Sequence, residues 1–174
     1  PMNTPALGGR DGDGGLEVVS CGDDGQVWAW HLDGSIMAGY PVATGFYPLS
    51  GPLLTDLDGA PGVEVVVAAQ DGSVYAYGAG GVPIAGGIPL KGWPVTVAMN
   101  PHAPVAGRLG PNATPVVVVT AGNQLYAFSP SGALRPGFPV TLGGNATQDP
   151  ALGDLDGDGF DEIVVATVVP STIE

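Results

Sequence analysis

The stretch Ala151-Leu-Gly-Asp-Leu-Asp-Gly-Asp-Gly-Phe-Asp-Glu-Ile-Val-Val165 sets acidic residues on a short glycine-rich loop that runs directly into a β-branched strand. Asp154, Asp156, Asp158 and Glu162 occupy positions 1, 3, 5 and 9 of this loop. Crowded oxygen ligands suit a hard cation, above all calcium, which would also remove the repulsion between the carboxylates. An EF-hand is excluded, because its loop has a glutamate at position 12 and lies between helices. The stretch therefore predicts a calcium loop followed by a strand.

Related copies of this stretch occur three times earlier in the chain. Equivalent positions fall at Leu7, Leu54, Ala106 and Leu152, so the copies are 47, 52 and 46 residues apart. A period of this length is typical of repeat architectures in which each repeat is one supersecondary unit. We therefore read the chain as one repeating fold without a linker between domains.

The earlier copies keep the acidic loop to different degrees. The first has Gly9 in place of the first aspartate and retains the acids Asp11, Asp13 and Glu17. The second retains Asp56, Asp58 and Glu64, but it reads Ala60-Pro61 where Asp-Gly belongs. The third has Arg108 at the first position and no carboxylate, so we expect its site to be lost.

Each complete copy continues with the same series of strand and turn signals. A valine-rich strand leads to a turn such as Asp71-Gly72, a hairpin signal, and then to an alternating aromatic strand such as Val74-Tyr-Ala-Tyr77. A Gly-aromatic-Pro-Val signature follows, as in Gly92-Trp-Pro-Val95. Its proline cannot donate a hydrogen bond, so this fourth strand should lie at the outer edge of its sheet. Four short strands in about 45–50 residues match one blade of a β-propeller.

The predicted fold is therefore all-β, with β-propeller-type four-stranded antiparallel blades. The blades should span about 5–48, 49–100 and 101–147, with a half blade over 148–174, in a single partial propeller over residues 1–174. The paired aromatics of each third strand should wedge against the neighbouring blade. About three and a half blades leave an open propeller, so either the chain is part of a longer one, which we favour, or copies associate.

These residues resemble the FG-GAP/VCBS-type repeat, the calcium-binding blade unit of integrin α-chain propellers and of many bacterial surface proteins. The resemblance covers the whole chain, and the Asp-x-Asp-x-Asp-Gly-x-x-Glu loop of the last copy is its most specific part. It implies that Ca²⁺ is held between the first two strands of a blade. It also implies that Phe160 adds its backbone carbonyl to the carboxylates of Asp154, Asp156, Asp158 and Glu162.

Charge and composition narrow the range of partners and locations. The formal net charge is -13, so nucleic acid and anionic membrane surfaces are unfavourable partners. Membrane insertion is not expected either, because no apolar run approaches the ~18 residues that a spanning helix needs. Cys21 is the only cysteine, so it cannot form an intrachain disulfide. Weak calcium loops suit the millimolar calcium outside cells, and we expect an extracellular or cell-surface protein, with bacterial secretion favoured.

No catalytic motif accompanies the repeat, and we expect a protein that is not an enzyme. His31 and His102 are the only histidines, and neither has a nucleophile motif beside it. The leading hypothesis is a calcium-stabilised module that binds a protein or glycan ligand, as in adhesion. Two alternatives stay open: a self-assembling subunit whose open propeller ends associate, and the propeller part of a larger secreted enzyme such as a polysaccharide lyase or a protease.

Overall fold

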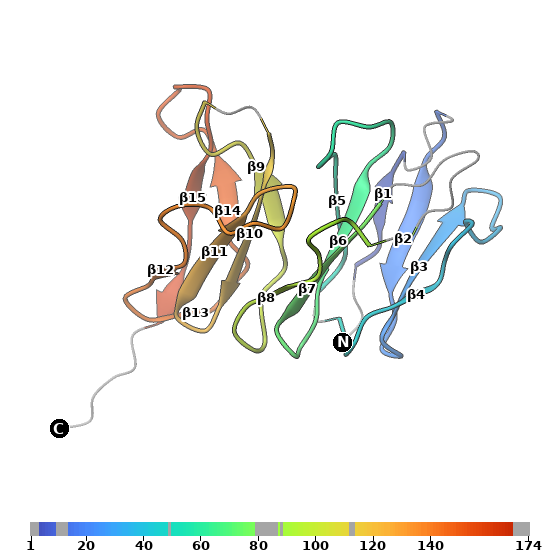
Figure 1. The fold of residues 1–174 in the computed structure, drawn as a ribbon, viewed down its shortest axis with the longest axis horizontal. Coiled ribbons are helices and arrows are strands. Elements are labelled where there is room, and N and C mark those ends of the chain that lie inside the picture. Colours follow the sequence, from blue (N-terminus) through green and yellow to red (C-terminus); the bar gives the residue numbers. More distant parts are fainter. Residues whose placement is uncertain are drawn as a thin grey trace.

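Each of the first three repeats folds into an antiparallel sheet of four short strands, here called blades 1, 2 and 3 (Figure 1). The computed structural model describes residues 4–9, 14–48, 50–78, 87, 89–111 and 114–168. Blade 1 contains β1 (Ala6–Gly8), β2 (Glu17–Cys21), β3 (Gln26–His31) and β4 (Val42–Ala43). Blade 2 contains β5 (Leu53–Thr55), β6 (Glu64–Ala68), β7 (Ser73–Tyr77) and β8 (Val95–Thr96). Blade 3 contains β9 (Val105–Gly107), β10 (Val116–Ala121), β11 (Gln124–Phe128) and β12 (Val140–Thr141). The predicted fold class, all-β with propeller-type blades, is confirmed.

The fourth repeat supplies half a blade. Its strands β14 (Ala151–Gly153) and β15 (Glu162–Val164) form a two-stranded sheet, called blade 4 here. The chain then enters β16 (Thr167–Val168), which pairs with β13 (Asn145–Ala146) in the segment after blade 3. An equivalent pairing occurs earlier as the isolated bridge between Pro48 and Ala69. The segment before blade 2 and the segment before blade 4 thus each pair with the blade that follows.

The hairpins form where the glycine turns predict them. At Gly72 the amide donates to the carbonyl of Ala69, and Asp71 Oδ1 accepts the amide of Ser73. Gly72 has a φ of 88°, which suits glycine far better than any residue with a Cβ. The hairpin therefore sets the register of β6 on β7, in which Val67 lies opposite Tyr75.

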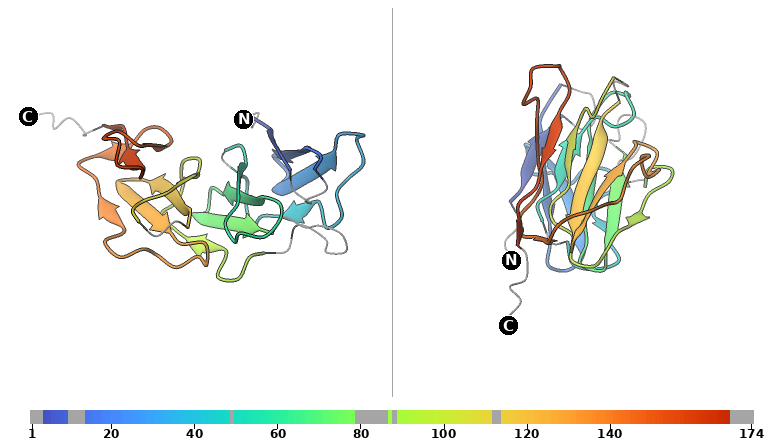
Figure 2. Two further views of the ribbon diagram at one scale, coloured as in Figure 1. Left: turned by 90° about the horizontal axis from the view of Figure 1, so that it is seen from above. Right: turned by 90° about the vertical axis from the view of Figure 1, so that its left-hand side faces the viewer.

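The blades lie side by side in an arc, and the first strand of each blade neighbours that of the next (Figure 2). Each of blades 1 to 3 has an aromatic face, which carries the paired rings of its third strand, and an opposite aliphatic face of mainly valine and alanine. The ring pairs are Trp28 with Trp30, Tyr75 with Tyr77, and Tyr126 with Phe128. In blades 2 and 3 the aromatic face packs on the aliphatic face of the preceding blade, as expected from the sequence.

The interface between blades 1 and 2 also buries the single cysteine. Cys21 packs with Val19, Val65 and Tyr77 in one core cluster. Burial raises the pKa of the Cys21 thiol to about 12, because the thiolate would lose its hydration there. The side chain therefore stays protonated at neutral pH and behaves as a small apolar residue.

The Gly-aromatic-Pro-Val signature joins the outer edge of one blade to its neighbour. The fourth strands β4, β8 and β12 lie at sheet edges, as the prolines predict, and each follows a cis X-Pro bond. In blade 2 the Trp93 ring meets Phe128 of blade 3 edge-on at 6.0 Å between centroids, and its Nε1 donates to Pro130 O at 2.9 Å. The signature is thus a docking element as well as an edge strand.

Candidate metal centre

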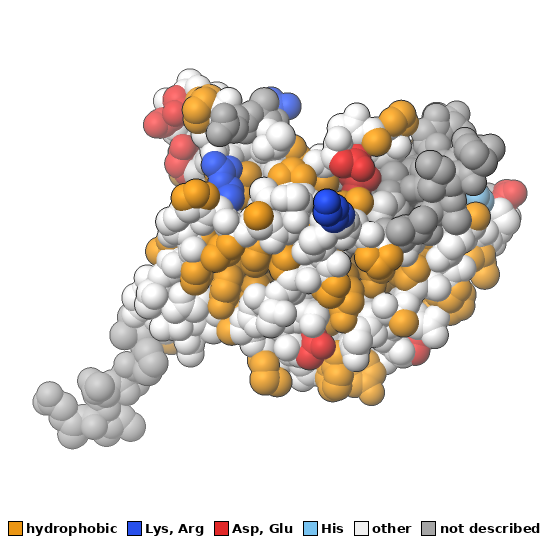
Figure 3. Space-filling view, in the orientation of Figure 1, with side chains coloured by type: hydrophobic (Ala, Val, Ile, Leu, Met, Phe, Trp, Pro, Cys, Tyr) orange, Lys and Arg blue, Asp and Glu red, His pale blue; other side chains and the backbone are white. Residues whose placement is uncertain are grey.

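The acidic loops join the first two strands of a blade, and the register of these strands fixes both ends of each loop. Glu64 opens β6 opposite Thr55, and Glu162 opens β15 opposite Gly153. Because the first aspartate of each loop follows its strand immediately, strand pairing alone brings loop positions 1 and 9 close together. The loops lie along one edge of the arc, where acidic side chains gather in the space-filling view (Figure 3).

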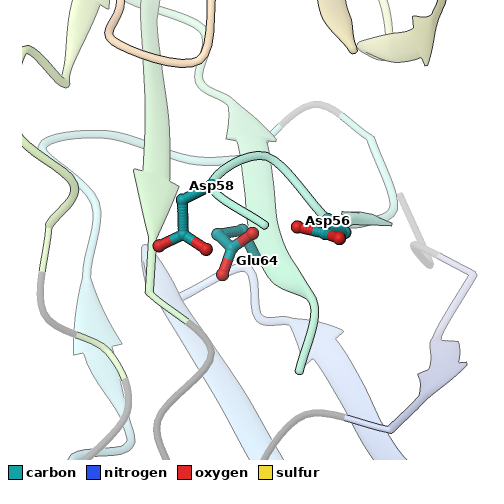
Figure 4. A group of neighbouring side chains, drawn as sticks. All are labelled: Asp56, Asp58 and Glu64. Atoms are coloured by element: carbon teal, nitrogen blue, oxygen red, sulfur yellow. The ribbon is translucent and has the colours of Figure 1, made fainter. Parts of the chain in front are cut away.

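In blade 2 the three predicted carboxylates converge. Oxygens of Asp56, Asp58 and Glu64 all lie within 4.8 Å of one another, and Glu64 lies between the two aspartates in Figure 4. Glu64 is 1% exposed, whereas both aspartates are exposed. Departure of this loop from the pattern at Ala60-Pro61 does not disturb the group, because neither residue supplies one of these oxygens.

Backbone amides hold the blade 2 carboxylates in place. Glu64 Oε2 accepts the amide of Leu57 at 2.7 Å. Asp56 Oδ1 accepts the amide of Gly59 at 2.7 Å, and Asp58 Oδ1 accepts that of Ala60 at 2.8 Å. Hydrogen bonds from amides stabilise the ionised carboxylates that a cation requires.

Blade 4 repeats this arrangement. Asp154, Asp156 and Glu162 form a second group of carboxylates with oxygens within 4.8 Å of one another. Glu162 Oε2 accepts the amide of Leu155 at 2.7 Å, which matches the bond from Leu57 to Glu64. Asp154 accepts two amides, those of Gly157 and Gly159. Three oxygen ligands at one point suit a hard cation such as calcium, whose other positions water and carbonyl groups can fill.

The remaining predicted ligands of blade 4 stand apart from this group. Asp158 is not one of the three converging carboxylates, and its Oδ1 accepts the amide of Phe160 at 2.9 Å. The carbonyl of Phe160 stays a prediction as a ligand. Blades 2 and 4 thus share the same three-carboxylate arrangement, although the sequence of blade 4 follows the loop pattern more closely.

In blade 1 only the last predicted ligand can be placed. Asp11 and Asp13 lie outside the described residues. Glu17 opens β2 opposite Gly8, as Glu64 and Glu162 do in their blades, and it is 2% exposed. His31 Nδ1 lies 3.8 Å from Glu17 Oε1, so this histidine borders the blade 1 loop, a proximity that the sequence did not predict.

Blade 3 replaces the acidic loop with a contact between blades. Asp161 Oδ2 accepts the Arg108 amide at 2.7 Å, and the Asp161 amide donates to the Arg108 carbonyl at 2.8 Å. The sequence did not predict this role of Asp161, which lies at a loop position where the related copies carry Leu16 and Val63. The only available signal was the presence of an acid at an otherwise apolar position.

The second histidine lies in the connection between blades 2 and 3. His102 Nε2 is 3.1 Å from the Ala146 carbonyl, and His102 Nδ1 is 3.9 Å from Asp149 Oδ1. Asp149 Oδ1 also accepts the amide of Ala103 at 2.8 Å. His102, Ala103 and Asp149 line a hollow of about 710 Å³ where the first strands begin. His102 thus contacts the segments that precede blade 4.

The sequence matches no protein-family profile and no curated protein. Among solved structures, the chain is similar to one described as the crystal structure of BBS1N in complex with ARL6DN, soaked with lead. The match has a TM-score of 0.54 and 16% identity, covers 98% of this chain, and spans 49% of the other chain. At this identity the likeness concerns the fold alone, and it agrees with the β-propeller architecture. Across the part of the chain that the structure describes, no helix is long and apolar enough to cross a membrane.

Proposed function

We propose that the chain is a calcium-stabilised β-propeller module that binds a protein or glycan outside the cell and has no catalytic activity of its own. The observation that carries the metal part is the recurrence of one geometry in blades 2 and 4. In both, two aspartates and the glutamate that opens the next strand bring oxygens within 4.8 Å. Bringing three such groups together costs free energy unless a cation neutralises them. A divalent ion bound there would tie the first strand of the blade to the second.

Calcium is expected to stabilise the chain, and removal of calcium should lower its melting temperature. At a free concentration 100 times the Kd, one site adds about 2.7 kcal/mol to the free energy of unfolding. Thermal unfolding in 5 mM CaCl₂ and in chelator measures the difference, and isothermal titration counts the sites. Glu64→Gln and Glu162→Gln should each remove part of the calcium-dependent shift. Asp23→Asn, which removes a charge in the turn after β2 and away from the acidic loops, should leave the shift unchanged. Equal melting temperatures in calcium and chelator would refute the metal role.

The ligand part of the proposal is supported by apolar side chains on the loops after the fourth strands. Phe46 and Tyr47 are 46% and 52% exposed, and Met99, at the position equivalent to Phe46, is 67% exposed. Exposed aromatic and methionine side chains suit recognition of proteins and of sugar rings. The high negative charge argues that the ligand is not itself strongly acidic.

We expect the chain to bind selected glycans on an array through the loop after β4. The Tyr47→Ala variant should bind at least about fivefold more weakly, because an aromatic anchor at such a surface contributes more than about 1 kcal/mol. Leu134→Ala, which removes a 42% exposed side chain after β11, is the matched control. An array without any bound glycan would refute the glycan form of the proposal and leave a protein ligand.

A further inference from the structure

The hollow of about 710 Å³ lies where the connections between blades turn into the first strands. These strands line the concave side of the arc, and the connections before blades 2, 3 and 4 all reach the hollow (Figure 2). A volume of ~300–1,000 Å³ is typical of sites for small ligands. The hollow is therefore large enough for such a ligand, and its lining indicates the kind.

Repeated proline rings form an apolar part of the lining. Pro52 and Pro104 hold equivalent positions at the start of blades 2 and 3, so they belong to the repeat itself. Pro101 and Leu53 line the same hollow. Sites for small ligands combine apolar surface of this kind with a few fixed polar groups that orient the ligand.

Asp149 supplies a fixed hydrogen-bond acceptor in the hollow. The equivalent residues of blades 2 and 3 are Gly51 and Ala103, so the repeat itself does not require a carboxylate here. Asp149 Oδ1 accepts the Ala103 amide at 2.8 Å, whereas Oδ2 has no hydrogen bond to any of the described residues. The side chain is 61% exposed. One oxygen thus positions the carboxylate, and the other is open to a ligand.

His102 supplies a second acceptor beside this carboxylate. A carbonyl can only accept, so the contact of 3.1 Å with the Ala146 carbonyl makes Nε2 the donor atom of the ring. In the neutral form of the ring, Nδ1 then carries a lone pair, and it lies 3.9 Å from Asp149 Oδ1. Asn100 adds a carboxamide that makes no hydrogen bond to the described residues. The lining therefore offers neighbouring acceptors to a ligand that donates hydrogen bonds.

We propose that the hollow binds a neutral sugar residue, with two neighbouring hydroxyls donating to Asp149 Oδ2 and His102 Nδ1. Neighbouring hydroxyls on a sugar ring match two acceptors that lie close together, and the proline rings can cover the C–H face of the sugar. The proposal extends the glycan form of the proposed function to a second site, because Tyr47 does not line the hollow.

The charge of the lining favours a neutral ligand over an ion. Asp149 is the only Asp, Glu, Lys or Arg among the described residues of the lining, so an acidic ligand would meet a like charge without a counter-ion. An ammonium ligand is less favoured than a sugar, because these residues include no aromatic ring and the carboxylate already accepts the Ala103 amide.

Amide chemical shifts of the ¹⁵N-labelled chain test the site, with the methyl glycosides of glucose, galactose, mannose and N-acetylglucosamine as probes. We expect at least one probe to shift the amides of Asn100, His102 and Ala103, with a Kd on the order of 1 mM for a ligand of this size. Asp149→Asn should raise the Kd at least about tenfold, because the charged acceptor is lost while an oxygen remains for the Ala103 amide. Asp71→Asn is the matched control, because Asp71 Oδ1 also accepts a backbone amide but the residue does not line the hollow.

A second variant keeps the test independent of any change in folding. Asn100→Gly removes the carboxamide at a φ of 55°, which glycine adopts freely. It should raise the Kd about two- to tenfold, the usual effect of one neutral hydrogen bond. Both variants should keep the amide spectrum of the parent chain away from the hollow.

Unshifted amides around the hollow with every probe at 50 mM would overturn the proposal, and so would equal Kd values for Asp149→Asn and the parent chain. Binding of ethylammonium that depends on Asp149, without binding of any sugar, would assign the hollow to a cation instead. Shifts confined to the loop after β4 would overturn this site and leave the glycan binding proposed for Tyr47 in place. Shifts at the hollow that Tyr47→Ala leaves unchanged would support this site independently of that loop.

Discussion

Replacing Gly92 by alanine is expected to destabilise the chain by about 3–5 kcal/mol, a large share of the stability of a domain of this size. Gly92 has a φ of 91°, which L residues rarely adopt. A Cβ on Gly92 would also collide with the carbonyl oxygen of Ser131 in blade 3. That carbonyl belongs to the turn whose Pro130 O accepts the Trp93 indole N–H, so the turn cannot move away without breaking the contact between blades.

Gly137→Ala is the matched control, because Gly137 holds the same place in the signature of blade 3. Its φ is 88°, yet among the described residues no atom outside its immediate chain neighbours lies within 4 Å of a Cβ built on it. The free energy of unfolding of this variant should fall by only about 1–2 kcal/mol, the cost of a left-handed backbone at a residue with a Cβ. Urea unfolding at constant m-value measures both losses. Equal losses would mean that the close approach of Gly92 to blade 3 does not contribute.

The comparison of these glycines shows which parts of the fold are readable from sequence. Strand order, the hairpin turns and the edge position of the fourth strands follow from local signals such as Asp71-Gly72 and Pro94, and the structure confirms them. The contact of Gly92 with Ser131 depends on the rotation between two blades. No local signal encodes that rotation, so the glycine could be recognised as a turn residue and not as a contact between blades.

The candidate metal centres also have one part that is predictable from the sequence and one part that is not. Because Glu64 and Glu162 open strands that pair with the start of their loops, the strand register accounts for the meeting of the carboxylates at loop positions 1 and 9. The loop interior was not predictable to the same degree. There, the backbone amides decide how each aspartate turns, and Asp158 accepts the amide of Phe160 outside the group of three.

The second large effect is expected at Leu57, the residue between the two aspartates of the blade 2 loop. Leu57 is 3% exposed and packs in the cluster between blades 2 and 3. Leu57→Ala should cost about 2–5 kcal/mol, because it leaves a cavity that the surrounding sheets fill only in part. The backbone amide that binds Glu64 Oε2 is retained, so the calcium-dependent shift should persist in the destabilised variant.

Leu155→Ala makes the same change at the equivalent position of blade 4, where the side chain is 69% exposed. It should cost less than about 0.5 kcal/mol, as most surface substitutions do. Urea unfolding of the parent chain and both variants at 1 μM measures the contrast, and a large loss for Leu155→Ala at that concentration would contradict it.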